Sequence, residues 1–476
     1  MKKYHVVVGL EMHCEMKSNS KVFSTASNIY NANSNTNVRP ICIGLPGILP
    51  NLNFECVKKA IMAAMILNCK IPDMMLFDRK NYYYPDLPKG YQITQNTSPV
   101  GVHGNIDVLG NNGLFKVTIQ DIHLEEDAAQ LDHLTTVSLI NYNRAGVPLL
   151  ECVTDPCIYS ADDAVSFIET MCRIYQYTDI SDADVRRGQI RCDVNVNLQD
   201  EDGNFITPKV EIKNVNSVSN VHDAIEYEFK RQSLAYENGK VDELVQETRR
   251  FDEETGTTIH MRSKVDAIDY KYFVEPNIPP FIITDELKAE IKNKIPMLAL
   301  ERKEMYMNKY KLEEYDANIL IKDRHIADYF EKCVSVGIDA KTAANWVNGV
   351  ITAYLYKNEI SIDDFYLKPE LLKQIIDKME DKTISSKQAK DIFNKALEDK
   401  KEPISYISDD IKQVSDEGLL ESIIDKLIND NPSLVSDYQN GRTNIFDFFV
   451  GQTMKETKGK ANPNITKELL HQKLDK

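Results

Sequence analysis

The sequence lacks the features that would place it in a membrane or outside the cell. No uninterrupted apolar run approaches the roughly 20 residues that a membrane-spanning helix needs. The nine cysteines are odd in number and scattered, and no two of them form a CxxC pair. This excludes a zinc ribbon and argues against a disulfide framework. The apolar start is interrupted by Glu11 and His13, as in a strand and unlike a signal peptide. We therefore expect a cytoplasmic protein that does not associate with membranes.

The chain also lacks an excess of positive charge and the common nucleotide and hydrolase motifs. Its 57 Lys and Arg residues against 73 Asp and Glu leave a formal net charge of −16. The overall field of such a chain repels a polyanion, so any nucleic-acid contact needs local basic patches or another subunit. No Walker loop, GxGxxG, HExxH or GxSxG is present. Composition alone favours a metabolic enzyme.

The length of 476 residues predicts two or three globular domains. The glycine content and the spacing of apolar residues change along the chain. Up to about Thr284, most glycines accompany short stretches that alternate apolar and polar residues; from Asp285 onward, apolar residues recur at helical spacing. The paired prolines within 277–281 predict a linker, and a charged run before Pro403 predicts a softer boundary. We predict three domains, at residues 1–290, 291–400 and 401–476.

Two helices are predicted between the strands of the front region. Ser160 is a favourable N-cap, with Asp162 and Asp163 in the first turn of the helix that follows. The second helix covers 221–236 and stops at Gly239. Because one face of each predicted strand is polar, the strands are expected to run antiparallel. The front region is therefore α+β.

The first predicted strand carries chemistry on one face. Its side chains alternate, so Glu11, His13 and Glu15 lie on the side opposite Leu10 and Met12. Carboxylate and imidazole groups at two-residue spacing suit a divalent cation. The alternative is an ordinary solvated strand face.

Four further segments show polar faces that such a sheet could bring together. The polar residues are His123 and Glu125 in 122–127, Glu151 at the end of 146–151, Arg191, Asp193, Asn195 and Asn197 in 191–198, and Lys209, Glu211 and Lys213 in 209–214. Acids would hold a metal, and Arg or Lys would hold phosphate oxygens. Segment 122–127 taken alone could equally be an acidic turn. Together the segments predict a metal- and phosphate-binding enzyme with a charged sheet surface.

A loop at residues 77–92 interleaves basic residues with four tyrosines and is stiffened by prolines. Such a loop could stack bases and contact phosphates. The alternative is a tyrosine-rich packing loop.

At these segments the sequence resembles the B subunits of bacterial aspartyl/glutamyl-tRNA amidotransferases, the GatCAB complexes. The matching pieces follow the family's order and cover nearly the whole chain. They are VGLEMH at 8–13, GLPGILP at 44–50, the loop 77–92, HLEEDA at 123–128, YNRAGVPLLE at 142–151, RCDVNV at 191–196, EIKN at 211–214, MRSK at 261–264 and GKANP at 459–463.

The resemblance implies both a fold and an activity. The fold is a cradle domain related to glutamine synthetase, then a helical domain, then a small helical tail of the YqeY kind. The activity is that of a carbon–nitrogen ligase, in which ATP activates the side-chain carboxylate of misacylated Glu-tRNA(Gln) or Asp-tRNA(Asn). Ammonia made from glutamine by the A subunit then displaces phosphate. A C subunit joins the two in a heterotrimer.

The resemblance and the strand faces together assign roles to individual residues. Magnesium is expected at Glu11, His13, Glu125 and Glu151, with manganese as an alternative because histidine is an unusual ligand for magnesium. Supporting carboxylates are Glu126 and Asp193, and the residues expected to meet ATP phosphates are Lys80, Arg191 and Lys213. The tail would grip tRNA through Lys455, Lys458 and Lys460, unless these lysines are simply solvated.

Two segments depart from the family pattern. An acidic pair and Gly-Ser usually precede the Arg-Cys-Asp strand, but this chain has Arg186-Arg187-Gly188-Gln189-Ile190. The usual Ala-Gly-Lys after HLEED is Ala128-Ala129-Gln130, so a phosphate contact could be lost here and replaced by the extra arginines. These departures fit a divergent paralogue with an altered substrate. The competing functions are a non-catalytic tRNA-binding scaffold and a small-molecule ligase of the glutamine synthetase type, which the tyrosine loop and the tail disfavour.

Overall fold

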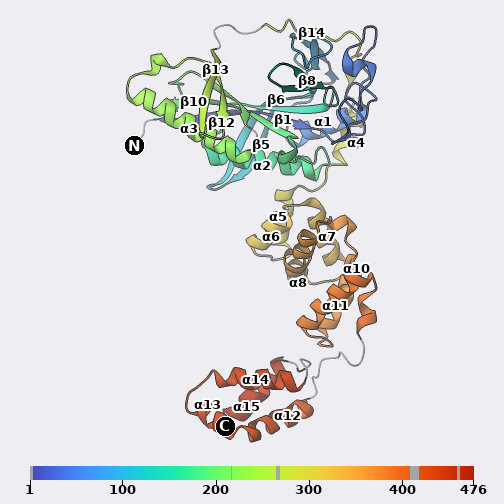
Figure 1. The fold of residues 1–476 in the computed structure, drawn as a ribbon, viewed down its shortest axis with the longest axis vertical. Helices are drawn as coiled ribbons and strands as arrows, with labels where there is room; N and C mark the ends of the chain where they lie inside the picture. The colour runs from blue at the N-terminus through green and yellow to red at the C-terminus, as the bar shows by residue number, and fades with distance from the viewer. Residues whose placement is uncertain are drawn as a thin grey trace. The chain divides into compact units, whose positions relative to one another are not determined.

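The computed structural model describes residues 4–215, 217–263, 269–407, 417–457, 461 and 463–475 (Figure 1). The chain divides into two compact units, Met1–Ala299 and Leu300–Lys476. The first is α+β and the second is helical, which confirms the predicted fold class. The division into three domains and the relation to glutamine synthetase stay predictions.

The first unit is built around an eight-stranded sheet of order β13-β12-β11-β10-β1-β9-β6-β5. The strands are β1 (Tyr4–Glu15), β5 (Gly101–Gly110), β6 (Gly113–Glu126), β9 (Pro148–Thr154), β10 (Ile190–Asp200), β11 (Val210–Val215), β12 (Glu247–Asp252) and β13 (Thr257–Ser263). Neighbouring strands are antiparallel, as predicted, except that β11 and β12 are parallel. The exception arises because helix α3 (Val218–Glu237) connects these two strands, and a helical crossover returns the chain in its original direction.

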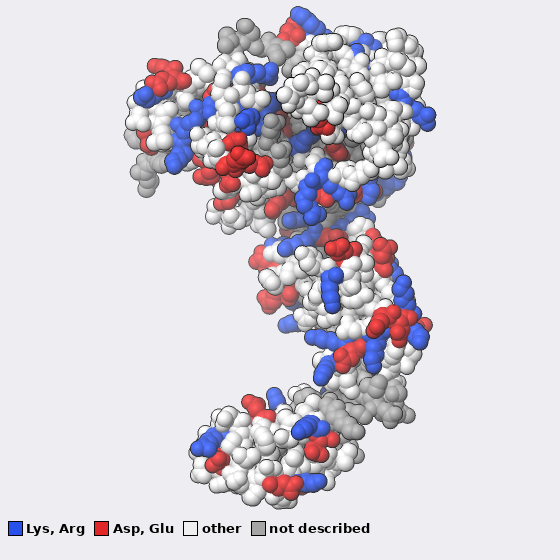
Figure 2. All heavy atoms as spheres, viewed as in Figure 1, with Lys and Arg blue, Asp and Glu red and all other residues white. Residues whose placement is uncertain are grey.

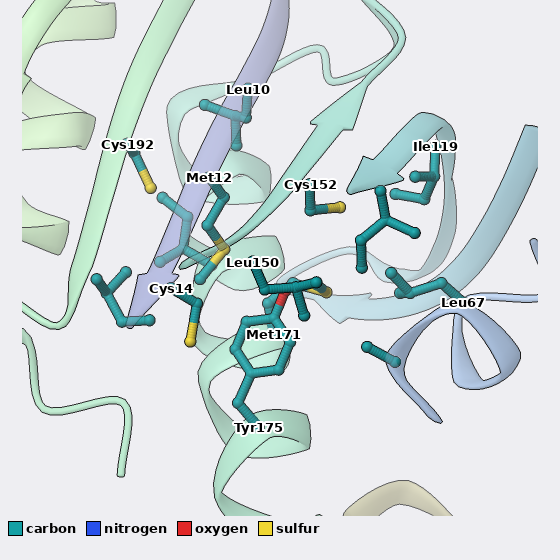
Figure 3. Close-up of a cluster of buried hydrophobic side chains, with 14 of the residues drawn as sticks. Leu10, Met12, Cys14, Leu67, Ile119, Leu150, Cys152, Met171, Tyr175 and Cys192 are labelled. Atoms are coloured by element: carbon teal, nitrogen blue, oxygen red, sulfur yellow. The ribbon is translucent and has the colours of Figure 1, made fainter. Parts of the chain in front are cut away.

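One face of the sheet is apolar. Helices cover this face (Figure 1). Leu10, Met12 and Cys14 of β1 point toward Met171 and Tyr175 of α2 (Ala161–Tyr177), and all five are almost fully buried (Figure 3). Burying each large apolar side chain stabilises the fold by about 1.5–3 kcal/mol. This packing fixes which way β1 faces, so Glu11 and His13 must lie on the opposite side.

The two predicted helices of this unit are present with their caps. The side chain of Ser160 accepts a hydrogen bond from the Asp163 amide and begins α2, as predicted. Helix α3 begins earlier than predicted, because Ser217 caps it through the Asn220 amide. Gly239, with φ of +65°, follows the end of α3 and allows the left-handed turn there.

Smaller elements complete the first unit. They are α1 (Phe54–Ile66), α4 (Asp285–Lys292), the sheet of β14 (Phe273–Val274), β3 (Asp78–Asn81) and β4 (Tyr91–Thr94), the pair β15 (Phe281–Ile282) and β2 (Met74–Met75), and the hairpin β7 (Gln130–His133) and β8 (Ser138–Asn141). The predicted linker at 277–281 lies inside this unit, since Phe281 pairs with Met75. Nearby, buried Glu275 accepts hydrogen bonds from Arg79 at 2.5 and 3.0 Å. The prolines there mark an irregular turn rather than a free connection.

The second unit consists of helices. They are α5 (Ala299–Asn308), α6 (Glu314–Leu320), α7 (Arg324–Ser335), α8 (Ala340–Asn345), a π-helical segment (Trp346–Ile351), α9 (Thr352–Asn358), α10 (Pro369–Glu380), α11 (Ser386–Asp399), α12 (Glu417–Asp430), α13 (Pro432–Gln439), α14 (Ile445–Glu456) and α15 (Pro463–Leu474). The last four share a hydrophobic core built from residues of the tail alone. Within the described residues, no helix combines the length and apolar character that a membrane span requires.

Basic and acidic side chains are interspersed on the face of the molecule shown in Figure 2. Both signs occur on each unit there, so the net charge of −16 does not produce a uniformly acidic surface on that face. Local clusters of cations therefore decide where an anion can bind.

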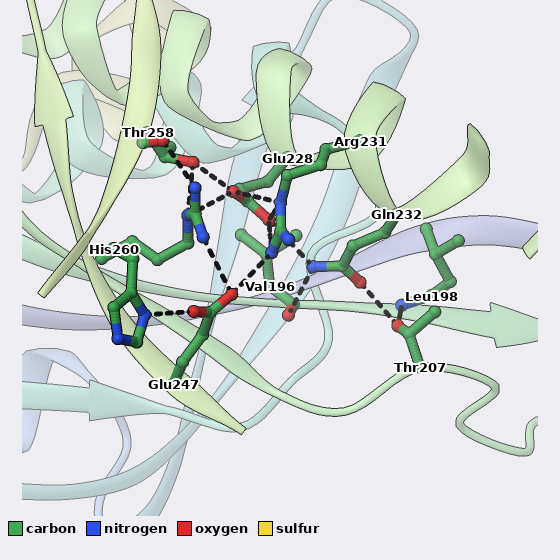
Figure 4. Close-up of polar contacts among 10 residues, drawn as sticks. Val196, Leu198, Thr207, Glu228, Arg231, Gln232, Glu247, Thr258 and His260 are labelled. Atoms are coloured by element: carbon green, nitrogen blue, oxygen red, sulfur yellow. Dashed lines mark hydrogen bonds and ion pairs between the residues drawn. The ribbon is translucent and has the colours of Figure 1, made fainter. Parts of the chain in front are cut away.

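A buried ionic network joins α3 to the edge of the sheet (Figure 4). Glu228 has no exposed surface and accepts hydrogen bonds from Arg231 at 2.9–3.1 Å and from Thr258. Glu247 of β12 accepts from Arg231 at 3.1 Å and from Arg249 at 2.9 Å. The network holds β12 and β13 against the helix that precedes them.

We expect Glu228→Gln to destabilise the first unit by about 3 kcal/mol. The substitution removes a carboxylate and leaves the buried guanidinium charge beside it without that partner. Thermal unfolding of the full chain by circular dichroism measures the loss. Fluorescence of Trp346, the only tryptophan, reports on the second unit and should keep its transition. Glu226→Gln, on the exposed side of the same helix, is the control and should change neither signal. Equal stability of the two variants would contradict the role of the network.

Candidate active site on the polar face of the sheet

The polar face of the large sheet carries rows of charged residues that cross several strands. In one row His13 of β1 lies opposite Arg191 of β10 on one side and Glu151 of β9 on the other. Glu151 in turn lies opposite His123 of β6. In the next row Glu11 lies opposite Asp193. Antiparallel register therefore brings together side chains that are far apart in sequence.

Two imidazoles and two carboxylates meet at the centre of this face. We call His13, His123, Glu125 and Glu151 the imidazole–carboxylate cluster. Nε2 of His13 lies 3.2 Å and Nε2 of His123 lies 3.1 Å from the same Oε2 of Glu151. Glu125 approaches both rings, at 3.8 and 3.9 Å. The predicted ligands His13, Glu125 and Glu151 thus lie together, with His123 as a fourth member.

Charge within this cluster is strongly coupled. Burial alone would raise the pKa of Glu151, but the two imidazoles hold the pKa well below its usual value. Burial would lower the pKa of His123, yet Glu151 and Asp121 raise it well above normal. Burial and the charge of Glu151 raise the pKa of Glu125. Two imidazoles therefore act as counterions to carboxylates in a site with little access to water.

Neighbouring groups orient the members of the cluster. Nδ1 of His123 lies 2.8 Å from Oδ1 of Asp121, which leaves Nε2 directed at Glu151. The Thr94 hydroxyl donates a hydrogen bond of 2.9 Å to Glu125. A carboxylate behind an imidazole fixes the ring and raises its basicity, as is common around metal ligands.

The fourth predicted ligand belongs to a neighbouring group. Glu11 lies with Asp193 and Glu211, which we call the oxygen cluster, and one oxygen of each lies within 4.8 Å of the others. Lys213 bridges Asp193 at 2.5 Å and Glu211 at 3.2 Å, and Asn195 donates to Glu11 at 3.0 Å. Glu11 and His13 are two residues apart on β1, so the clusters lie about 7 Å apart.

Both clusters have donors that suit a divalent cation. His13, Glu125 and Glu151 each offer a ligand atom within 4.8 Å of the others. Ligands about 2.0–2.2 Å from one ion lie roughly 3–4.3 Å apart, so small side-chain rotations would close the set. Imidazole in the first cluster favours manganese, and the all-oxygen second cluster favours magnesium. A bound cation would add to the positive charge with which His13 and His123 already compensate Glu125 and Glu151.

The predicted phosphate-binding residues surround these clusters. Burial alone would lower the pKa of Lys80 on β3, but Glu125 and Glu151, together with Tyr272, raise it; the ammonium also lies 5.0 Å from the Tyr270 ring centroid. Arg191 donates a hydrogen bond of 2.8 Å to Asp127. Together with Lys213, these cations are held in place by acids yet remain on the polar face.

Glu126 lies away from the imidazole–carboxylate cluster. Its side chain accepts hydrogen bonds from Lys89 at 2.8 Å and from the Ile93 amide at 2.9 Å. Adjacent strand residues point to opposite faces, which explains why Glu125 joins the cluster and Glu126 does not. Its supporting role at a metal stays a prediction, while its contacts anchor β4.

The tyrosine loop has a packed part and an exposed part, so it fits both the packing and the binding interpretation of its sequence. Tyr82 contacts Tyr270 at 5.8 Å between ring centroids, and Arg79 stacks on Tyr91 at 4.2 Å. Tyr83 is 94% exposed and Tyr84 is 48% exposed. Half of the loop therefore packs, and half is free to contact a partner.

Several other predicted positions can also be located. Arg186 and Arg187 form the short 3-10 turn η2 (Val185–Arg187), directly before β10. Ala129 is buried and Gln130 begins β7. Lys455 is exposed on α14. Lys264, Lys458, Gly459, Lys460 and Asn462 lie outside the described residues.

Sequence reasoning missed the residues that complete the site. His123 and Glu211 were visible on polar strand faces, but only the cross-strand register shows that they join His13 and Glu11. Asp121 carried no signal of its own, and Asp127 was noticed only as the last acid of segment 122–127. Their importance comes from His123 and Arg191, the side chains that they hold.

We expect Glu151→Gln to weaken Mn²⁺ binding at least about 100-fold, because the variant removes the carboxylate shared by both imidazoles. His123→Asn should weaken it about 10-fold. Electron paramagnetic resonance of Mn²⁺ added to the purified chain measures both. Asp107→Asn, which changes an exposed acid on β5 outside both clusters, is the control and should bind as the wild type does. A wild-type affinity in Glu151→Gln would rule out a cation in this cluster.

Comparison with known proteins agrees with this geometry. A family model described as the GatB/GatE catalytic domain matches residues 6–289. The model GatB_Yqey, described as the GatB domain, matches residues 328–474, which include most of the predicted YqeY-like tail at 401–476 and part of the predicted helical domain at 291–400.

Curated relatives cover the chain from end to end. The aspartyl/glutamyl-tRNA(Asn/Gln) amidotransferase B subunit 2 of Clostridium acetobutylicum is 42% identical over 99% of both chains. The corresponding B subunit of Persephonella marina is 41% identical over 99% of this chain and 100% of its own. That of Caldanaerobacter subterraneus subsp. tengcongensis is 40% identical over the full length of both. The resemblance is thereby confirmed, and the chain belongs to the family of aspartyl/glutamyl-tRNA(Asn/Gln) amidotransferase B subunits.

Proposed function

We propose that this chain is the ATP-using, tRNA-handling subunit of a heterotrimeric amidotransferase. It would phosphorylate the side-chain carboxylate of misacylated Glu-tRNA(Gln), Asp-tRNA(Asn) or both. An A subunit would supply ammonia from glutamine, and a C subunit would join the two. The names of the relatives support the substrate class and a multi-subunit assembly. The observation that carries the proposal is the placement of Glu151 between two imidazoles beside Lys80.

The enzyme class predicted from the sequence is a carbon–nitrogen ligase that takes its nitrogen from glutamine. Membership of the amidotransferase family confirms this class. The cytoplasmic location stays a prediction.

The chemistry explains why ATP is needed. A carboxylate is a poor acyl donor because its leaving group would be oxide. Transfer of the γ-phosphoryl group from ATP to a carboxylate oxygen releases ADP and creates a better leaving group. Ammonia then attacks the carbonyl carbon and loses a proton, the C–O bond to phosphate breaks, and the amide remains. Phosphoryl transfer asks the protein mainly to position the reactants and to neutralise charge.

The residues of the polar face fit these two tasks. His13, Glu125 and Glu151 would hold a divalent cation. Glu11 and Asp193 would hold a magnesium ion nearby through their carboxylate oxygens. A bound cation would neutralise the phosphoryl oxygens. Lys80, Arg191 and Lys213 would bind phosphate oxygens through charge-assisted hydrogen bonds. The buried setting strengthens each of these interactions.

The helical tail would contribute to tRNA binding. Lys455 on α14 is exposed, and the basic residues that follow it in the sequence are Lys458 and Lys460. A local basic patch of this kind suffices for phosphate contacts even in an acidic chain.

We expect Glu125→Gln, in the full complex, to lower the kcat of aminoacyl-tRNA-stimulated ATP hydrolysis at least about 100-fold. tRNA affinity should stay within about 2-fold, because the lost carboxylate faces the cation rather than the nucleic acid. Asp107→Asn, an exposed acid on β5, serves as the matched control. Unchanged ATP hydrolysis in Glu125→Gln would favour the scaffold function instead.

Truncation after Ile407 tests the role of the tail. The tail has its own hydrophobic core, so its removal leaves the first core intact. We expect the KM for aminoacyl-tRNA to rise about 10-fold through lost phosphate contacts, with the KM for ATP unchanged. Steady-state amidation by the assembled complex measures both. A small-molecule ligase would keep its activity after this truncation.

A further inference from the structure

A stacked tyrosine–arginine pair lies beside the catalytic face and has no role in the chemistry above. Cζ of Arg187 lies 5.2 Å from the centroid of the Tyr30 ring. The ring belongs to a residue that is 52% exposed, and the side chains of Arg187 and Arg186 are 48% and 93% exposed. An exposed aromatic ring held by a guanidinium is an oriented surface rather than a packed one.

The turn that carries the arginines is held by hydrogen bonds and ion pairs to Asp184. Asp184 accepts a hydrogen bond from the Arg186 amide at 2.9 Å and lies 3.3–3.4 Å from both guanidinium groups. Gln189 accepts a hydrogen bond of 2.9 Å from the Asp184 amide. Gly188, with φ of +71°, closes the turn. One acid facing two arginines leaves a net positive charge at this position.

Both halves of the pair are tied to the end of β1. The Gln189 carbonyl accepts a hydrogen bond of 2.8 Å from the Glu15 amide. On the other side, Asn28, two residues before Tyr30, donates a hydrogen bond of 3.3 Å to the Met16 carbonyl. The stacked pair is therefore fixed relative to the strand that carries His13.

Further cations continue the positive charge inward. Arg191 and Arg144 both approach Asp127, at 2.8 and 3.4 Å. Guanidinium groups therefore occur both on the surface turn and next to the site.

We infer that Tyr30 and Arg187, with Arg186, bind the unpaired nucleotides at the 3′ end of the aminoacylated tRNA. This inference rests on the proposed function and names the surface that receives that substrate. A base would stack on the exposed tyrosine, and the arginines would contact phosphates, which is how proteins bind single-stranded nucleic acid. The aminoacyl group at that 3′ end would then lie along β1 toward His13 and Glu151.

The test uses the full complex and variants of exposed residues. Arg187→Gln and Tyr30→Ala should each raise the KM for aminoacyl-tRNA about 5- to 20-fold, as expected for loss of one stacked base. The kcat and the KM for ATP should stay within about 2-fold. Tyr30→Phe keeps the ring and should behave as the wild type. Lys230→Gln, an exposed cation on α3, is the control for charge alone.

Two binding measurements test whether a loss of tRNA affinity comes from a lost contact with the unpaired 3′ nucleotides. In Arg187→Gln the slope of log affinity against log salt should fall by about 1, as for one lost phosphate contact. A tRNA that lacks its unpaired 3′ nucleotides should bind the wild type and both variants equally. A variant that loses affinity for this shortened tRNA as well would place the contact on the double-stranded part and overturn the inference.

The remaining outcomes are also decisive. Failure of Arg187→Gln to co-purify with the partner subunits would make the surface a protein interface and overturn the inference. Wild-type kinetics in both variants would overturn it too. Absence of amidation by the wild-type complex on either misacylated tRNA would instead contradict the proposed function.

Discussion

The pairing of β1 with β9 and β10 is the constraint on which the site depends. Burial of Leu10, Met12 and Cys14 against α2 leaves no freedom in the direction of this strand. A shift of one residue would exchange the apolar and charged faces and would bury Glu11 and His13 in the core. The register alone then places Glu151 and Asp193 next to β1.

Acids and cations on the polar face hold one another in place. Arg191 is held by Asp127 and Lys213 by Asp193, at 2.8 and 2.5 Å. Each cation is oriented before a ligand arrives, so less side-chain entropy is lost when an anion binds. The same pairing explains how a chain of net charge −16 can present usable positive charge. The excess of acids lies partly in these supporting positions.

The charged clusters and the helical tail rest on different hydrophobic cores. The charged clusters belong to the first unit, whose core includes the sheet and helices α1 to α3. The tail has a core of its own, formed by residues such as Leu420, Phe449 and Leu470. Separate cores allow the tail to change its surface without disturbing the strand register of the first unit.

The amino-acid sequence by itself determined the strand faces, the helical second half and the family. Alternation at 6–13 and at 191–198 fixed which residues face inward, because the period of a strand is local. It also singled out His13, Glu125 and Glu151. The parallel β11–β12 pair and the location of 277–281 inside the first unit did not follow from any local pattern.

Only the tertiary structure decided how the charged residues are grouped. It placed Glu11 with Asp193 and Glu211 rather than with His13, added His123, and turned Glu126 toward Lys89. It also brought Tyr30 to Arg187 across more than half of the first unit's sequence. The physical reason is that side-chain alternation is set within one strand, whereas neighbours across strands are set by register and by loop packing, which involve residues distant in sequence.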